Sequence, residues 1–245
     1  MTRIRIEPTN RRIRARQGDR EVADTTRAQL LFVEGRHPEY VFASQDIDVD
    51  LSVIATAVDE AGTFERIGEG GRRYVDGPAA GLVALDFDNV DEWFEEDEQL
   101  LHRPRDPYRR VDVLESNRQV EVSIDGVVVA KTTTPRLVDE TGLPPRWYIP
   151  SSDVDWSVLV PSNTTSACQY KGVASWWVFA VDPNRPLVDV AWSYEDPIPE
   201  APKLAGFVSF LAEHDHVDVT VDGAAVTIPA FEPSWVSPSL HIENA

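Results

Sequence analysis

Hydrophobic and polar residues alternate along much of the chain, and a repeat of two residues is typical of β-strands rather than helices. The segment Val120–Ile124 alternates in this way and is followed by Asp125-Gly126, a dipeptide that favours tight hairpin turns. Val217–Val221 shows the same alternation and leads into Asp222-Gly223. These patterns predict antiparallel hairpins.

Helical patterns are almost absent from the sequence. In the second half, Pro199–Ala205 is the only stretch whose composition suits a helical turn. Short strands separated by Gly, Pro and Asp residues are typical of all-β domains, either sandwich-like or partly closed. We therefore predict an all-β fold with very little helix.

The chain also contains an internal repeat. The segment Ala23–Asp48 aligns without a gap with Ala130–Asp155, and the sequence GLVAL from Gly81 matches GFVSF from Gly206. A repeat of roughly 110 residues has the size of a small single domain. The pattern therefore indicates two diverged copies of one domain.

A further match, VDEWF from Val90 against VDVTV from Val217, extends this alignment. Between the copies the chain is polar and contains Pro104 and Pro107, which favour a linker. The predicted boundaries are a degenerate first copy in residues 1–100, a linker in 101–115, a second copy in 116–228 and an extended tail in 229–245.

Composition and charge disfavour several classes of function. The net charge of −19 argues against binding to nucleic-acid phosphates, which depends on clustered Lys and Arg. The 245 residues include no apolar run of about 18, as a membrane helix needs, and the first residues lack the apolar segment of a secretory signal. We expect a cytoplasmic protein without nucleic-acid or membrane partners, and its oligomeric state stays open.

Positive charge is concentrated at the start of the chain. Residues 1–20 contain seven arginines against Glu7 and Asp19. We expect this arm to form a strand whose outward arginines pair with acidic groups of the same protein, including the run Asp91–Glu98. Contact with an acidic partner is the alternative.

Four motifs follow one another in the second half: ETGLPPRWYIP from Glu140, PSNTTSACQYKGVASWW from Pro161, AWSYEDP from Ala191 and GFVSF from Gly206. Together they resemble the signature of the bacterial and fungal family labelled domain of unknown function 427, over nearly all of residues 116–224. The resemblance implies the β-tent architecture, in which two small β-sheets are pinned at one edge. We therefore expect two tandem β-tent-like domains.

The chain departs from the family pattern in two places and loses it in the first copy. Gln169 stands where the family usually has proline, and Trp176 stands where tyrosine is usual. In the first copy, residues 57–74 lack the cysteine, the Tyr-Lys-Gly sequence and the tryptophan pair. Any functional site is therefore expected in the second copy alone.

The sequence predicts neither a metal nor a cofactor. Some β-tent domains hold zinc through four cysteines, whereas Cys168 is the only cysteine of this chain. His214 and His216 would share one face of a strand, but no third ligand is evident.

Cys168 and Lys171 are the candidate catalytic residues. A Cys168 thiolate needs a nearby cation, which Lys171 offers, and the alternative is a small residue that packs at a strand end. Lys171 is one of only three lysines, and Gly172 beside it would let a ligand approach closely. The lysine either holds an anionic or carbonyl group, forms a Schiff base if desolvation lowers its pKa, or is neutralised by an acid. In the last case the expected acids are Asp153, Glu195 and Asp196.

Aromatic residues gather around these two positions. Trp176 and Trp177 are consecutive and face opposite sides of a strand, whereas Trp192 and Tyr194 share one face. Most such rings belong to a core, but a few that converge with polar groups would form a small-ligand site. The predicted ligand-binding residues are Arg146, Tyr148, Tyr170, Trp177, Trp192 and Tyr194.

Together these features predict a protein that binds a small organic molecule in an aromatic-lined pocket of the second copy. An enzyme that uses Cys168 or Lys171 as a nucleophile is the alternative. A structural or protein-interaction module without a pocket is a second alternative. The sequence identifies neither a ligand nor a reaction, so whether the protein is an enzyme stays open.

Overall fold

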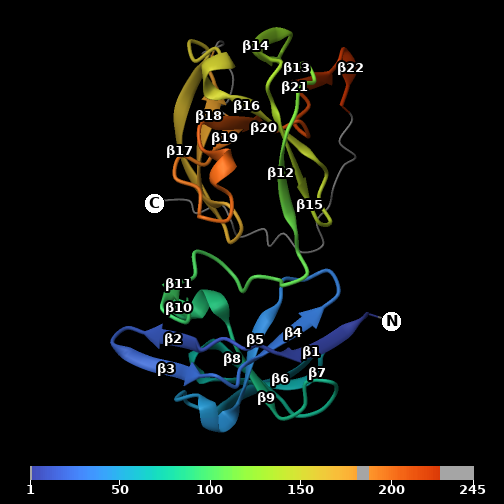
Figure 1. Cartoon of the computed structure of the whole chain (residues 1–245). Helices are drawn as coiled ribbons and strands as arrows, with labels where there is room; N and C mark the ends of the chain where they lie inside the picture. The colour runs from blue at the N-terminus through green and yellow to red at the C-terminus, as the bar shows by residue number, and fades with distance from the viewer. Residues whose placement is uncertain (1, 181–187, 227–245) are drawn as a thin grey trace. The chain divides into compact units, whose positions relative to one another are not determined.

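The chain folds into two units that are built almost entirely from β-strands (Figure 1). The computed structural model describes residues 2–180 and 188–226, so the predicted tail in 229–245 lies outside the described residues. The first unit extends to Asp106 and the second begins at Pro107. Helical residues of the described ranges occur only in 3-10 turns of three residues, which confirms the predicted all-β fold with very little helix.

The first unit consists of a large and a small antiparallel sheet. The large sheet has seven strands, in the spatial order β1 (Ile4–Pro8), β4 (Gln29–Val33), β5 (Glu39–Ala43), β9 (Leu82–Leu85), β8 (Gly71–Tyr74), β7 (Gly62–Ile67) and β6 (Val53–Asp59). The small sheet has four, in the order β11 (Glu98–Gln99), β10 (Glu92–Glu95), β2 (Ile13–Gln17) and β3 (Arg20–Thr25).

The second unit has the same two kinds of sheet. Its seven-stranded sheet has the order β12 (Val111–Glu115), β15 (Arg136–Glu140), β16 (Arg146–Pro150), β20 (Phe207–Phe210), β19 (Asp189–Ser193), β18 (Gly172–Phe179) and β17 (Leu159–Cys168). Its four-stranded sheet has the order β14 (Val127–Thr132), β13 (Val120–Ile124), β21 (Val217–Val221) and β22 (Ala224–Ala225).

The short 3-10 turns lie between strands. In the described residues they are η1 (Ser44–Asp46), η2 (Gly68–Gly70), η3 (Phe87–Asn89), η4 (Ser151–Asp153) and η5 (Pro202–Leu204). The last of these falls within Pro199–Ala205, the stretch expected to form a helical turn. Proline at its first position suits a helical start because the ring fixes the backbone angle and the missing N–H would be unpaired there anyway.

One strand occupies a segment that was expected to be a linker. β12 lies within residues 101–115 and pairs along its whole length with β15. Its alternate residues Val111 and Val113 pack against the aromatic cluster of the second unit. Apolar burial on one face of β12 explains why this segment is part of the sheet.

The two units share one strand order, as the internal repeat predicts. The large sheet of the first unit runs β1-β4-β5-β9-β8-β7-β6, and the corresponding strands of the second unit follow the same sequence of neighbours. An isolated β-bridge agrees with the ungapped alignment. It joins Ala23 to Ile47 in the first unit and the aligned residues Ala130 and Val154 in the second. The sequence repeat therefore has a counterpart in the strand connections.

The alignment of Val90 with Val217 is wrong by one residue. Trp93 pairs with Ala15 of β2, and Val219 pairs with Val122 at the corresponding place in β13. Both Trp93 and Val219 are buried. Because a shift of one residue would turn every side chain of a strand to the other face, burial fixes the correspondence of Trp93 with Val219.

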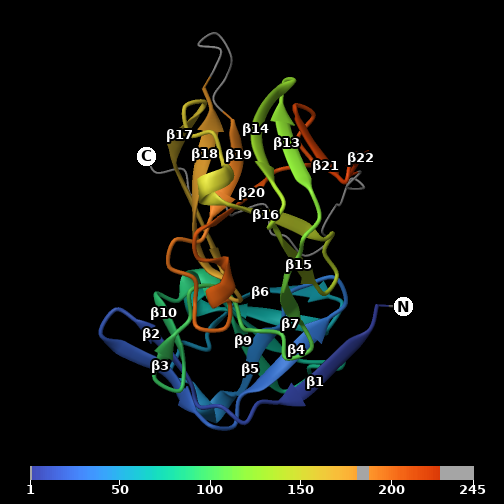
Figure 2. The ribbon, with the colours of Figure 1, turned by 45° about the horizontal axis from the view of Figure 1, so that its top comes forward.

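The large sheet of the second unit has two differently covered faces. Ile149 of β16 points toward the small sheet and packs with Val122 and Val219. Its neighbour Tyr148 points to the opposite face and joins a cluster that includes Trp192. Figure 2 shows the strands β13, β14 and β21 as a layer beside β17, β18 and β19. One face therefore supplies the core, and the other is available for a site.

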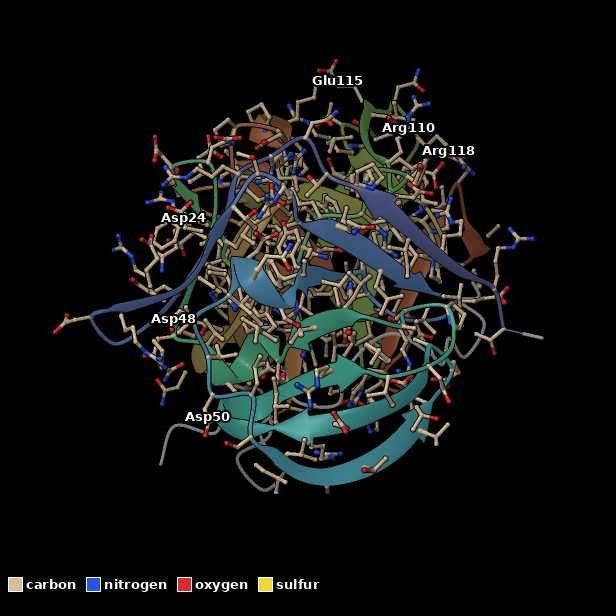
Figure 3. The ribbon with its side chains drawn as sticks, turned by 90° about the horizontal axis from the view of Figure 1, so that it is seen from below. Asp24, Asp48, Asp50, Arg110, Glu115 and Arg118 are labelled. Carbon is tan, nitrogen blue, oxygen red and sulfur yellow. The ribbon has the colours of Figure 1, made fainter. Side chains whose placement is uncertain are left out.

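The arginine arm pairs with acidic groups of the first unit, as predicted. Arg11 forms an ion pair with Glu95, and Arg14 lies 3.0 Å from Asp97. The side chain of Asp24, labelled in Figure 3, accepts a hydrogen bond from Arg12. These contacts place the arm in the sheet and confirm that the acidic run after Asp91 is among its partners.

The buried face of the first unit gives a stability prediction. Phe42 is fully buried, whereas the side chain of Val58 is 74% exposed. We expect Phe42→Ala to lower the free energy of unfolding by about 3–5 kcal/mol because it leaves a cavity, and Val58→Ala to change it by less than about 0.5 kcal/mol. Urea unfolding followed by circular dichroism measures both. Equal effects of the two substitutions would contradict the assigned core.

Candidate functional site

A glycine turn sets the position of Lys171. β17 and β18 are joined by residues 169–171, and Gly172 then has a φ of 112°, a region that side chains other than glycine rarely adopt. A Cβ at Gly172 would lie 3.3 Å from the carbonyl oxygen of Asp196 and from the amide nitrogen of Ile198. The Ile198 N–H donates to the Lys171 carbonyl at 3.1 Å. The turn is therefore held by the segment after β19.

Lys171 is buried and forms an ion pair with Glu140, at the end of β15. The other carboxylate oxygen of Glu140 accepts a hydrogen bond from Arg109 at 3.3 Å. Burial alone lowers the pKa of Lys171, but the groups of Cys168, Glu140 and Tyr148 outweigh it, and the pKa is raised overall. The lysine is therefore protonated at neutral pH.

Two indole rings form a wall beside this pair. The ring centres of Trp176 on β18 and Trp192 on β19 are 5.1 Å apart. The Trp192 N–H donates to the Tyr148 hydroxyl at 3.0 Å, and the Trp176 N–H donates to the Ser166 hydroxyl at 3.0 Å. Both rings are thus fixed by hydrogen bonds as well as by packing.

A second ion pair flanks this wall. Arg146 of β16 binds Glu213 through both of its terminal nitrogens, and its guanidinium carbon lies 5.5 Å from the centre of the Trp192 ring. This distance allows a cation–π contact. Arg146 is therefore held between an acid and an indole.

The two tyrosines of the site are uncharged at neutral pH. Burial raises the pKa of Tyr148, and Lys171 with the Trp192 hydrogen bond offsets this only in part. Burial also raises the pKa of Tyr194, to which Tyr148, Cys168 and Glu140 add. Because both hydroxyls keep their protons, each can donate a hydrogen bond.

These side chains surround a cavity of about 220 Å³ on the outer face of the large sheet. Its polar lining comes from Glu140, Arg146, Tyr148, Ser166, Lys171 and Tyr194. Its apolar lining comes from the two indoles of Trp176 and Trp192 and from Val138, Pro144 and Leu211. An apolar cavity of about 150 Å³ admits benzene, so this volume suits a ring with a small substituent.

Five of the residues predicted for the site line this cavity. They are Arg146, Tyr148, Lys171, Trp192 and Tyr194, and they come from β16, the β17–β18 turn, β19 and the residue that follows β19. Neighbouring antiparallel strands place side chains of the same parity on one face, which is why residues distant in sequence meet here.

Trp177 lies on the other face of the sheet and is a correction to the predicted site. It packs against the core beneath the small sheet, and its ring centre is 5.3 Å from that of Trp156. Trp176 takes its place in the cavity because it pairs directly with Trp192 of β19. The alternation of side chains was predicted, but only the strand register shows which indole faces the cavity.

Cys168 and Tyr170 also lie outside the cavity lining. Cys168 ends β17 and lies near the Tyr194 side chain, whose pKa it helps to raise. Tyr170 lies in the turn, and its ring centre is 5.8 Å from the guanidinium carbon of Arg109. Cys168 therefore supports the wall of the cavity through Tyr194.

Sequence reasoning missed Glu140, Trp176 and Ser166. The expected partners of Lys171 were Asp153, Glu195 and Asp196, but the buried acid is Glu140. The signal for Glu140 was its spacing of two from Val138, which places both on the same face of β15. Nothing in the sequence signals Ser166.

The first unit carries different side chains at the corresponding positions. Strand pairing places Ala61 where the second unit has Lys171, and Val33 where it has Glu140. Arg72 stands at the position of Trp192 and forms ion pairs with Glu39 at 2.5 Å and Asp59 at 3.4 Å. The first unit therefore lacks the buried lysine and the indole wall.

His214 and His216, which the sequence places two residues apart, lie near Asp125. The rings of His214 and His216 have centres 5.3 Å apart, and His216 lies 2.8 Å from Asp125. Within the described ranges, no three His, Cys, Asp or Glu side chains are placed to hold a metal ion. The same ranges contain no helix long and apolar enough to cross a membrane.

The second unit matches a known protein family. Comparison with family models matches residues 112–223 to the family described as Domain of unknown function (DUF427). Residues 112–223 of the second unit therefore form a DUF427-like domain. The DUF427 match includes every residue that lines the cavity, whereas the first unit lies outside it. No curated protein matches the chain.

The buried ion pair of the DUF427 domain gives a second stability prediction. Lys171→Met removes the cation and leaves the Glu140 carboxylate buried, which we expect to lower the free energy of unfolding by about 3 kcal/mol. The double variant Lys171→Met/Glu140→Gln removes both charges and should recover most of this loss. Urea unfolding followed by indole fluorescence measures both. A double variant no more stable than the single one would contradict a coupled pair.

The raised pKa values of the site predict the stability of this domain at alkaline pH. Lys171 stabilises the folded state while it is protonated, and this contribution is lost as pH rises through its folded pKa. Tyr148 and Tyr194 act in the same direction, because unfolding lets their phenols ionise near pH 10.

We therefore expect a constant free energy of unfolding up to about pH 9 and a fall above about pH 10. Urea unfolding between these pH values measures it, and Lys171→Met/Glu140→Gln should show a shallower fall. A profile with no alkaline fall would contradict the assigned environment of these groups.

Proposed function

We propose that the DUF427 domain binds a small organic molecule in the cavity beside Lys171. The observation that carries this proposal is the convergence of a buried, ion-paired lysine and two indoles on one cavity of about 220 Å³. An apolar wall with a few fixed polar groups is the usual form of a small-ligand site.

The first unit supports this proposal because it has the same strand order without the lysine–glutamate pair. Val33, Val41 and Ala61 occupy the positions of Glu140, Tyr148 and Lys171. Apolar residues of suitable size in place of a buried ion pair are often neutral or stabilising. The fold thus has no need of these charges, and binding gives a reason for keeping them.

Binding is favoured over covalent catalysis by two observations. A Schiff-base lysine needs a lowered pKa, whereas the pKa of Lys171 is raised by its neighbours. Cys168, the other candidate nucleophile, is outside the cavity lining. The cytoplasmic location and the absence of a nucleic-acid partner remain predictions from charge and composition.

Thermal-shift and fluorescence titration of the full chain test this proposal, with nucleosides, cyclic imides and aromatic acids as probes. At a concentration of about 100 times its dissociation constant, a ligand adds about 2.7 kcal/mol to stability. We expect at least one of these classes to raise the melting temperature and to quench indole fluorescence.

Two neighbouring substitutions on β17 supply the matched control. Ser166 lines the cavity, whereas Thr165 is exposed on the other face of the strand. Ser166→Phe should fill part of the cavity and weaken binding at least about tenfold, and Thr165→Phe should leave it unchanged. A chain that responds to none of the probes would favour the protein-interaction module.

A further inference from the structure

The cavity presents hydrogen-bond donors whose oxygen atoms are already engaged. The Tyr148 hydroxyl accepts from Trp192, and the Ser166 hydroxyl accepts from Trp176. Each hydroxyl therefore turns its own proton away from the indole that donates to it. Tyr148 is almost fully buried, and in residues 2–180 and 188–226 no acceptor for its proton is found. A buried donor without an acceptor is costly, so a bound acceptor is expected there.

Lys171 adds donors of positive charge to the same place. Its ammonium has three N–H bonds, and one of them donates to Glu140. Tyr148 and Lys171 both line the same cavity. The two donors therefore converge on one region of the cavity.

The charges of the lining also favour an anion. Arg146 is balanced by Glu213, whereas Glu140 is shared by two cations, Lys171 and Arg109. Glu140 is already bound by Lys171 and by Arg109, which weakens its repulsion of an anion. The charged lining residues and their ion-pair partners therefore carry one excess positive charge, in a chain whose net charge is −19.

We propose that the ligand is a small planar carboxylate, whose oxygens accept hydrogen bonds from Lys171 and Tyr148 while its flat body lies against the indoles of Trp176 and Trp192. This inference rests on the proposed function and names the class of ligand. One ammonium and one hydroxyl match the two acceptor oxygens of a carboxylate.

A doubly charged phosphate fits the same lining less well. Arg146 uses both terminal nitrogens on Glu213, so the site lacks the free guanidinium fork that phosphate recognition favours. The carboxylate of Glu140 would also repel a second negative charge. A nucleotide is therefore an outcome that would contradict the proposal.

The experiment compares acids with their neutral isosteres. Benzoate and cinnamate are titrated into the full chain at pH 7.5 beside benzamide and cinnamamide, with indole fluorescence and calorimetry as readouts. Each pair shares its ring and volume and differs in the carboxylate. We expect the acids to bind at least about tenfold more tightly, because a charge-assisted hydrogen bond is involved.

Substitutions test whether Lys171, Glu140 and Tyr148 cause the preference for acids over amides. Lys171→Met/Glu140→Gln should reduce the acid preference to less than about threefold, and Tyr148→Phe should weaken acid binding several-fold while it keeps the ring. The control is Lys131→Met, because Lys131 is exposed on β14 and pairs with Glu121 at 2.7 Å. Circular dichroism checks that each variant is folded. If the double variant does not fold, the affinity of Tyr148→Phe for the acids tests the proposal instead. Unchanged acid binding by this variant would overturn it.

The outcomes separate this inference from the proposed function. A preference for acids that the cavity variants abolish supports both the small-ligand site and the carboxylate ligand. Equal binding of acids and amides, blocked by Ser166→Phe, overturns the carboxylate and leaves the small-ligand site standing. An acid preference that survives in the double variant also overturns the inference. Failure of every probe overturns both, and tight binding of a nucleoside monophosphate alone overturns the carboxylate.

Discussion

The proposed site of the second unit depends on one interaction, the buried ion pair between Lys171 and Glu140. Two charges removed from water stabilise a fold only when their geometry is good and their remaining donors and acceptors are satisfied. Glu140 meets this condition through a further hydrogen bond from Arg109. Lys171 lines the cavity, so its remaining donors are available to the proposed ligand.

The first unit of the same chain forms this strand order without a lysine–glutamate pair. Both units share the strand order of their large sheets, and both have a buried tyrosine at one position, Tyr74 and Tyr194. In the first unit Tyr74 donates to Asp59 at 2.9 Å, whereas in the second Tyr194 contacts Cys168. The same scaffold thus carries either an internal acid–arginine cluster or an open cavity.

Much of this arrangement was predictable from the sequence, for a physical reason. Alternation with a period of two shows which residues share a face, and the repeat supplies the domain organisation. Trp177 was chosen over Trp176, but Trp176 lines the cavity. The alternation of side chains shows that the two indoles lie on opposite faces of the strand. It does not show which face carries the cavity until the neighbouring strand is placed. Glu140 was missed as the partner of Lys171 because the two meet across strands that are distant in sequence. Long-range pairing of this kind is decided by tertiary register.

The most direct test of the account is a crystal structure of the full chain, grown with benzoate and, separately, without it. The account predicts a Lys171 ammonium that contacts Glu140 and faces a cavity walled by Trp176 and Trp192, with carboxylate density beside Tyr148 in the first crystal. A Lys171 side chain in bulk solvent, with the indoles packed together over a closed cavity, would contradict it.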